Sequence, residues 1–270
     1  MIFFRKCYAF IKRDLITETS YKFAFFLQLF GIVISMLVFY FLSQLISGNE
    51  IGYLAPYGGN YFNFVLIGIA FSNYLNVAVR GLAKNIRDAQ MLGTLEALLV
   101  TQTQIPTIIL GSSLYSYIFA SFQVLIYLLL GGLFFGVDFG EANYLAAFLI
   151  LILTITAFSS IGIISASFIM IFKKGDPITW LFTSLSWLIG GVYYPIQILP
   201  TWLEKLSYLL PITYALEGMR LALLSGYSIP QLINHIIALL TFTLVLTPLS
   251  VALFIKAVKK AKTDGTLGQY

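Results

Sequence analysis

Charged side chains are scarce in this chain of 270 residues, and Asp, Glu, Lys and Arg are absent from six long apolar stretches. Charged residues make up 10% of the sequence and hydrophobic residues 59%, with a mean hydropathy of +0.91. A soluble globular domain carries about 25% charged residues, so this composition excludes one. The uncharged stretches are 23–46, 61–79, 107–135, 144–172, 178–194 and 232–255. Each comes near or above the ~20 residues that a helix needs to cross the hydrocarbon, and the fifth is the shortest. The sequence therefore predicts an all-α integral membrane protein with six transmembrane helices.

Other residue types are missing where particular chemistries would need them. Cys7 is the only cysteine, so an internal disulfide is excluded, and nothing spaces it toward a metal site. A carrier driven by protons or Na⁺ needs carboxylates or histidines within its spans, and only His235 is found there, near the outer end of the sixth. The chain has no Gly-Lys pair and hence no phosphate-binding G-x-x-x-x-G-K-[ST] loop. Ser159 and Ser160 lie in the fourth stretch without a base to activate them, which argues against a membrane-embedded hydrolase and favours close helix packing.

Lys and Arg are distributed unevenly among the loops, and this fixes an orientation. Only Lys205 and Arg220 fall on one side of the predicted membrane. The other basic residues are Arg5, Lys6, Lys12, Arg13, Lys22, Arg80, Lys84, Arg87, Lys173, Lys174, Lys256, Lys259, Lys260 and Lys262. Because short loops rich in Lys and Arg stay cytoplasmic, we expect both termini inside and the segment 195–231 outside. The net charge of +5 reflects this topology, and no nucleic-acid partner is expected.

The N-terminal residues 1–22 have the pattern of an interfacial helix. Phe4, Tyr8, Ile11 and Leu15 recur at helical spacing on one face, with basic residues away from it. The alternative is that the basic residues merely flank the first span.

The cytosolic segment 80–106 is longer than a bare connection requires. The second span can continue as a helix over 80–90 until Gly93 interrupts it. We expect a short helix to restart there, with Gly93 as its N-cap and Glu96 near the positive end of its dipole. Two turns are too few for a stable isolated helix, so something must pack on the apolar side formed by Leu95, Leu98 and Leu99. That partner could be this chain, the membrane surface or another protein.

The outer segment 195–231 is apolar but interrupted by Pro195, Pro200, Pro211 and Pro230, so it cannot be one helix. Two helices over 202–210 and 212–224, each too short to span, predict a re-entrant hairpin, with a pair of surface-lying helices as the alternative.

Two pairs of side chains stand out in and beside this segment. Glu217 and Arg220 are three residues apart, where they can form a structural ion pair, either within the helix or between subunits, rather than a substrate site. Tyr193 and Tyr194 precede Pro195 and could form an aromatic gate, although belonging to the aromatic belt of the membrane interface is the more ordinary explanation.

Two motifs resemble a known family. Gly93-Thr94-Leu95-Glu96-Ala97-Leu98-Leu99, followed by a Thr and then a Pro before a span, resembles the cytosolic GTLE-type segment of ATP-binding-cassette (ABC) transporter permeases of the ABC-2 type. The stretch 190–220, with its glycines, aromatics, Leu-Pro-x-Trp-Leu, Pro-x-Thr-Tyr and Glu-x-x-Arg, is similar to the outer segment of the same family. One departure is that residues 101–105 separate the GTLE segment from Pro106, where the family commonly has Thr-Pro directly.

The resemblance implies a membrane-spanning permease subunit of an ATP-driven exporter in the cell (plasma or inner) membrane. Two copies of a separate ATPase subunit would bind ATP and Mg²⁺, and this chain would hold no cofactor. A second permease chain, identical or homologous, would complete the path for an amphipathic or lipid-linked substrate, either a drug-like molecule or a glycan. The resemblance assigns coupling with the ATPase to Gly93, Thr94, Leu95, Glu96, Leu98 and Leu99. It assigns the outer gate and re-entrant segment to Tyr193, Tyr194, Pro195, Pro200, Trp202, Pro211, Glu217 and Arg220.

The alternatives are an ATP-independent channel or secondary carrier, and a scaffold for other membrane proteins. The sequence names neither the substrate nor the ATPase, and the direction of transport follows from the resemblance alone.

Overall fold

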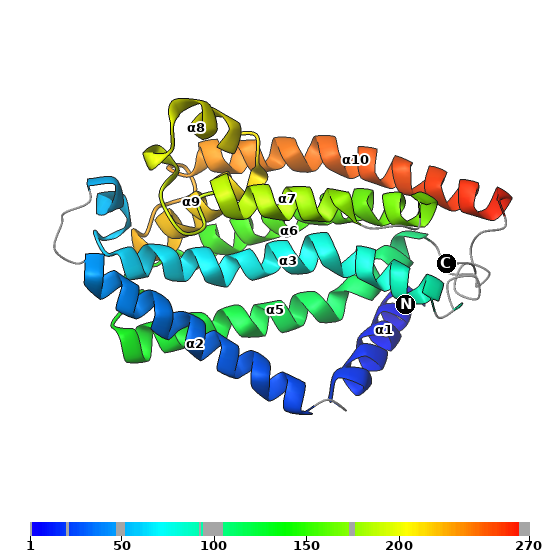
Figure 1. The fold of residues 1–270 in the computed structure, drawn as a ribbon, viewed down its shortest axis with the longest axis horizontal. Helices are drawn as coiled ribbons and strands as arrows, with labels where there is room; N and C mark the ends of the chain where they lie inside the picture. Colours follow the sequence, from blue (N-terminus) through cyan, green and yellow to red (C-terminus); the bar gives the residue numbers. More distant parts are fainter. Residues whose placement is uncertain are drawn as a thin grey trace.

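The computed structural model describes residues 2–19, 22–46, 52–91, 93, 105–172 and 176–264, and the regular elements within these ranges are all helical (Figure 1). In chain order they are α1 (Ile2–Thr19), α2 (Lys22–Ile46), η1 (Gly52–Tyr57), α3 (Tyr61–Met91), α5 (Ile105–Phe135), α6 (Tyr144–Phe172), α7 (Pro177–Ile189), η2 (Ile196–Ile198), α8 (Thr201–Ser207), α9 (Pro211–Leu224) and α10 (Ile233–Thr263). The prediction of an all-α integral membrane protein is confirmed.

Within the described ranges, five helices are long and apolar enough to cross a membrane: α2, α3, α5, α6 and α10. The predicted fifth span, 178–194, is wrong in its length. The helix α7 has 13 residues, or about 20 Å, against the ~30 Å of a hydrocarbon core. Asp176 caps its start by accepting a hydrogen bond from the Thr179 backbone N–H at 3.0 Å. It ends because Gly190 and Gly191 follow, and Gly191 has a φ of +76° that favours glycine.

The helix α3 lies at the centre of the bundle. In its most apolar window 72% of the residues are buried, against 11% for α2 and α10, and it packs on α2, α5, α6, α7 and α9. It approaches α6 closely, because a Cβ at Gly162 would overlap the backbone carbonyl of Ala78. Small residues at such crossings allow helices in a membrane to pack without a bulky side chain between them.

The helix α3 also confirms that the second span continues as one helix past residue 79. It runs without a break from Tyr61 to Met91, and Gly93 then has a φ of +67°, the left-handed conformation common just after a helix. The expected restart of a helix, with Thr94, Leu95, Glu96, Leu98 and Leu99, lies outside the described residues.

The N-terminal helix α1 packs along α5, with Cys7 buried and the Phe10 ring against Gly111. Tyr8 and Leu15, from the predicted membrane-facing stripe, remain exposed. Ile11 of the same stripe is half-buried, and the interfacial position of α1 stays a prediction.

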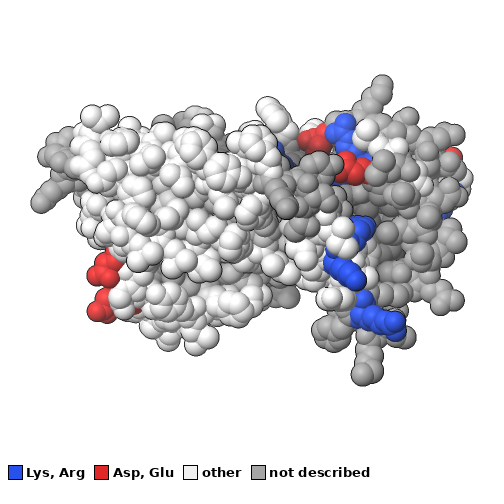
Figure 2. Space-filling model, turned by 90° about the horizontal axis from the view of Figure 1, so that it is seen from below, with Lys and Arg blue, Asp and Glu red and all other residues white. Residues whose placement is uncertain are grey.

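Charge is separated along the molecule. Figure 2 shows one face with acidic side chains at one end, a wide uncharged band, and Lys and Arg only at the opposite end, next to a few acidic side chains. The exposed Asp138 and Glu141 belong to the connection between α5 and α6, and the exposed Lys84, Arg87 and Lys259 belong to the far ends of α3 and α10. The uncharged band is where hydrocarbon would surround the helices, and the basic end agrees with the predicted cytoplasmic side.

Candidate functional site

The outer segment contains two short helices, close to where the sequence places them. They are α8 (Thr201–Ser207) and α9 (Pro211–Leu224), and Pro211 occupies the first position of α9, where its missing N–H costs nothing. Nearly all of α9 is buried against α3, α6 and α10. A helix lying on the surface would keep one face open, so this burial favours the re-entrant alternative.

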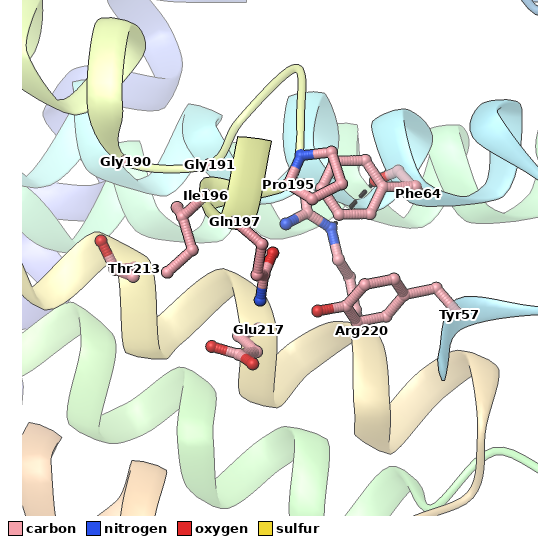
Figure 3. Close-up of a pocket in the computed structure, with 10 residues that line it drawn as sticks. All are labelled: Tyr57, Phe64, Gly190, Gly191, Pro195, Ile196, Gln197, Thr213, Glu217 and Arg220. Carbon is pink, nitrogen blue, oxygen red and sulfur yellow. Dashed lines mark hydrogen bonds between the residues drawn. The ribbon is translucent and has the colours of Figure 1, made fainter. Parts of the chain in front are cut away.

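Arg220 is the charged residue that fixes α9 in place. Its side chain is 3% exposed, Nε donates to the Phe64 carbonyl at 3.0 Å, and one terminal nitrogen donates to the Val192 carbonyl at 3.0 Å. The guanidinium carbon lies 3.5 Å from the centre of the Phe64 ring, a cation–π contact (Figure 3). One side chain thus joins α9, α3 and the turn that follows α7. We call this meeting point of Phe64, Val192 and Arg220 the outer junction.

Glycines make room for the outer junction. A Cβ at Gly68, one turn beyond Phe64 on α3, would lie 2.6 Å from the Arg220 guanidinium and would overlap the Val192 carbonyl. Gly191 brings the chain back toward Arg220 through its positive φ. The guanidinium is therefore enclosed by backbone on two sides.

Glu217 and Arg220 do not form the predicted ion pair within this chain, and a pair between subunits stays a prediction. Glu217 instead approaches His235 of α10, with 3.6 Å between Oε2 and Nε2, and its carboxylate points away from the guanidinium in Figure 3. The reason is that Arg220 turns toward α3, where two carbonyls accept its N–H groups. The other ring nitrogen of His235, Nδ1, is buried and has no hydrogen-bond partner among the described residues.

A small cavity beside the outer junction has a volume of about 10 Å³. Its walls include Tyr57, Pro195, Thr213, Glu217 and Arg220 (Figure 3). A cavity of this size is close to the minimum for one water molecule, so it has no room for a substrate. Burial raises the pKa of Tyr57 to about 12, and the negative charge of Glu217 acts in the same direction. The phenol beside Arg220 is therefore neutral, and the arrangement is suited to holding helices together.

The tyrosines of the expected gate lie in the turn between α7 and η2. Tyr193 stacks on Phe39 of α2, with 5.4 Å between ring centres, and contacts Trp187 of α7 at 5.3 Å. The Tyr194 hydroxyl donates to the Leu188 carbonyl. Both rings are half-buried and connect the end of α7 to its surroundings, and a gating role stays a prediction.

The remaining predicted residues of the outer segment have separate positions. Pro195 is buried beside Arg220, whereas Pro200 precedes α8 and is exposed. Trp202 projects from α8 with 64% of its surface exposed. The structure therefore brings together Pro195, Glu217 and Arg220 and leaves Pro200 and Trp202 outside the cluster.

Comparison of the chain with models of known protein families identifies the kind of protein to which it belongs. The family model for ABC-2 type transporters matches residues 5–224, which is most of the chain. The chain belongs to the ABC-2 type transporter family.

Relatives of the same kind are found in bacteria. The inner membrane transport permease YadH of Escherichia coli K12 is 28% identical over 202 residues, which cover 73% of this chain and 76% of that protein. YadH of Shigella flexneri matches to the same extent.

Membership of the ABC-2 family makes this chain a membrane transport permease and a multi-pass protein of the inner membrane. ABC-2 permeases lack ATPase motifs themselves, so membership implies pairing with an ABC ATPase subunit. Within the described ranges of this permease, no group of three or more His, Cys, Asp or Glu side chains could hold a metal ion.

Sequence reasoning found Arg220 of the ABC-2 permease but missed Phe64, Gly68 and Val192. Phe64 and Val192 contribute backbone carbonyls, which every residue has, so their identity carried no signal. A weak signal was available at Gly68, a glycine within a span and hence a possible point of close approach.

Proposed function

We propose that this permease is the membrane-spanning subunit of an ATP-driven exporter. Two such chains, identical or homologous, would enclose a path, and two ATPase subunits would bind ATP and Mg²⁺ on the cytoplasmic side. The cargo would be an amphipathic or lipid-linked molecule, drug-like or a glycan, leaving the cytoplasm or the inner leaflet. The permease itself would bind no cofactor and hydrolyse no ATP.

The observation that carries this proposal is the length and position of α3. Its 31 residues extend about 46 Å, longer than the ~30 Å hydrocarbon core. The excess lies at the basic end, where α3 leads through Gly93 into the predicted ATPase-coupling residues. Because α3 is also the most buried span, a push on its cytosolic end would reach the centre of the bundle.

The outer junction would transmit the movement of α3 to the outer side of the membrane. The Phe64 carbonyl on α3 accepts from Arg220, and Arg220 also holds the turn that carries Tyr193 and Tyr194. A shift of α3 along its axis would therefore displace α9 and the two tyrosines together. In this mechanism Tyr193 and Tyr194 form an outer gate whose position depends on α3.

The neutral membrane interior supports ATP as the energy source. The six apolar stretches contain no Asp or Glu with which to couple transport to protons or Na⁺. His235 and Glu217 lie together near the outer end, where they cannot form a relay across the membrane.

The first test is to purify the C-terminally tagged chain from its native host in mild detergent and identify what accompanies it. We expect an ABC ATPase, and we expect Leu95→Asp plus Leu99→Asp to abolish the association because two buried charges would destroy an apolar contact. A matched control is Lys259→Asp plus Lys262→Asp, two exposed residues at the cytosolic end of α10, which should keep the ATPase. Retention by the leucine variant would place the contact elsewhere, and absence of any ATPase from the wild type would favour an ATP-independent channel.

A further inference from the structure

A second and much larger cavity lies between α3, α5, α6 and α10, with a volume of about 380 Å³. Its floor is buried and is formed by Ala78, Leu82, Ser113, Ser160 and Ile163. Its rim is half-buried and includes Leu114, Tyr117, Thr156, Ser159, Thr247 and Val251. The space exists because α5 and α6 both pack on α3 but make little contact with each other. A buried floor with a half-exposed rim describes a site that opens to the surface of the bundle.

The wall of this cavity has no charge and little unused hydrogen-bonding capacity. Among the residues that the structure describes, no Asp, Glu, Lys, Arg or His lines it. Thr156 donates to the Ile152 carbonyl of its own helix at 2.8 Å, Ser160 and Thr247 share a bond of 2.9 Å, and the Tyr117 and Ser159 hydroxyls bond each other. With these hydroxyls partnered, the surface offered to a ligand is mainly methyl and methylene groups. Such a site favours an apolar ligand over water.

The position of the cavity along the helices points to the cytoplasmic half of the membrane. On α5 it is lined by residues 113–117, about 12–18 Å from the cytosolic start of that helix at Ile105. On α3 it is lined by Ala78 and Leu82, which flank Arg80, the first basic residue after the span. The medium outside the rim at this depth is the acyl region of the inner leaflet.

The volume sets the size of the occupant. A cavity of ~150 Å³ with apolar walls takes up benzene, so 380 Å³ corresponds by proportion to on the order of fifteen carbon atoms. That number of carbon atoms is a large part of one lipid chain, and the volume falls within the usual range for small-molecule sites.

We propose that this cavity binds one acyl chain of an inner-leaflet phospholipid, inserted between α5 and α6 against α3. The site belongs to a single permease chain and depends on neither the ATPase nor the direction of transport.

The test uses the full chain, with any co-purifying subunits, in nanodiscs of phosphatidylethanolamine and phosphatidylglycerol. A small fraction of phosphatidylcholine with a diazirine in the middle of one acyl chain serves as the probe, and adducts are located by mass spectrometry after illumination. We expect labelling of Tyr117, Ser159 and Thr247 to exceed that of openly exposed residues such as Phe30 and Leu244.

Filling the cavity with larger side chains should remove the excess labelling of the lining residues. Leu114→Phe plus Thr156→Phe adds two rings from opposite walls, and labelling at Tyr117 and Ser159 should fall to the level of the open surface. The control is Leu240→Phe plus Thr241→Phe on the exposed side of α10. It makes the same changes, and Thr241 forms the same own-helix bond of 2.8 Å, to Ile237. If the double variant fails to fold, Val251→Phe fills the cavity from α10 instead.

Two results would overturn the proposal. Labelling of the lining residues equal to that of Phe30, and unchanged by the added rings, would mean that lipid only surrounds the bundle. Complete protection of the lining residues would mean that a second protein chain covers the rim.

Discussion

The two halves of α3 have very different surroundings. At its outer half Arg220 fills the space around Phe64 and Gly68, and the cavity beside it is about 10 Å³. At its inner half, around Ala78 and Leu82, a cavity of about 380 Å³ is left.

The helix α9 accounts for this difference. It packs against α3, α6 and α10, and its residues Ile212, Ala215 and Met219 line a small cavity together with Phe71 and Tyr74 of α3. The cavity at the inner half is lined by α3, α5, α6 and α10, and α9 contributes no residue to it. The outer half is therefore closely packed around Arg220, while the inner half leaves space for a ligand.

The largest loss of stability is expected from a substitution that removes the outer junction. Arg220→Ala deletes the donors to Phe64 and Val192 and leaves a void, so the free energy of unfolding should fall by about 2–4 kcal/mol. Arg220→Lys should retain only part of the stability that Arg220→Ala loses, because an ammonium group cannot reproduce the planar fork of donors. SDS-induced unfolding of the purified chain in mixed micelles measures both. The control Lys205→Ala, exposed on α8, should change nothing, and an equally stable Arg220→Ala would show that the junction does not hold the outer half together.

The second prediction compares two glycines of α3. Gly68→Ala places a Cβ against the Val192 carbonyl and the Arg220 guanidinium, and overpacking of this kind costs about 1–3 kcal/mol. Gly81→Ala has nothing within 4 Å of the new Cβ and should stabilise the helix by up to about 1 kcal/mol. The same unfolding assay applies to both variants. Equal effects would mean that the two halves of α3 are packed alike.

The smallest effect is expected at the inner cavity. The bond of 2.9 Å between Ser160 and Thr247 connects α6 to α10, and a double-mutant cycle with Ser160→Ala and Thr247→Val should give a coupling of about 1 kcal/mol. A coupling as large as the loss in Arg220→Ala would remove the contrast between a tightly packed outer half and a looser inner half.

Much of the fold could be predicted from the sequence because local patterns encode it. Long apolar stretches defined α2, α3, α5, α6 and α10, and the proline spacing separated α8 from α9. The predicted length of the fifth span was too great because the apolar run in the sequence continues through Gly190 and Gly191, where the backbone leaves the helix.

The candidate site was predicted only in part. Arg220 stood out as a cation in an apolar segment, but Glu217, the nearest acid in the sequence, was the wrong partner. The true partners are the carbonyls of Phe64 and Val192, which lie 156 and 28 residues away. Backbone acceptors at that separation have no sequence signature.

The sequence by itself determined that the chain spans a membrane, which end is basic, and where helices must break, because hydropathy, charge and proline act locally. Only the tertiary structure decided which groups accept the hydrogen bonds of Arg220, and that α9 fills the outer half of the bundle while the inner half keeps a large cavity. These are matters of space between helices, and space depends on how all the helices pack at once.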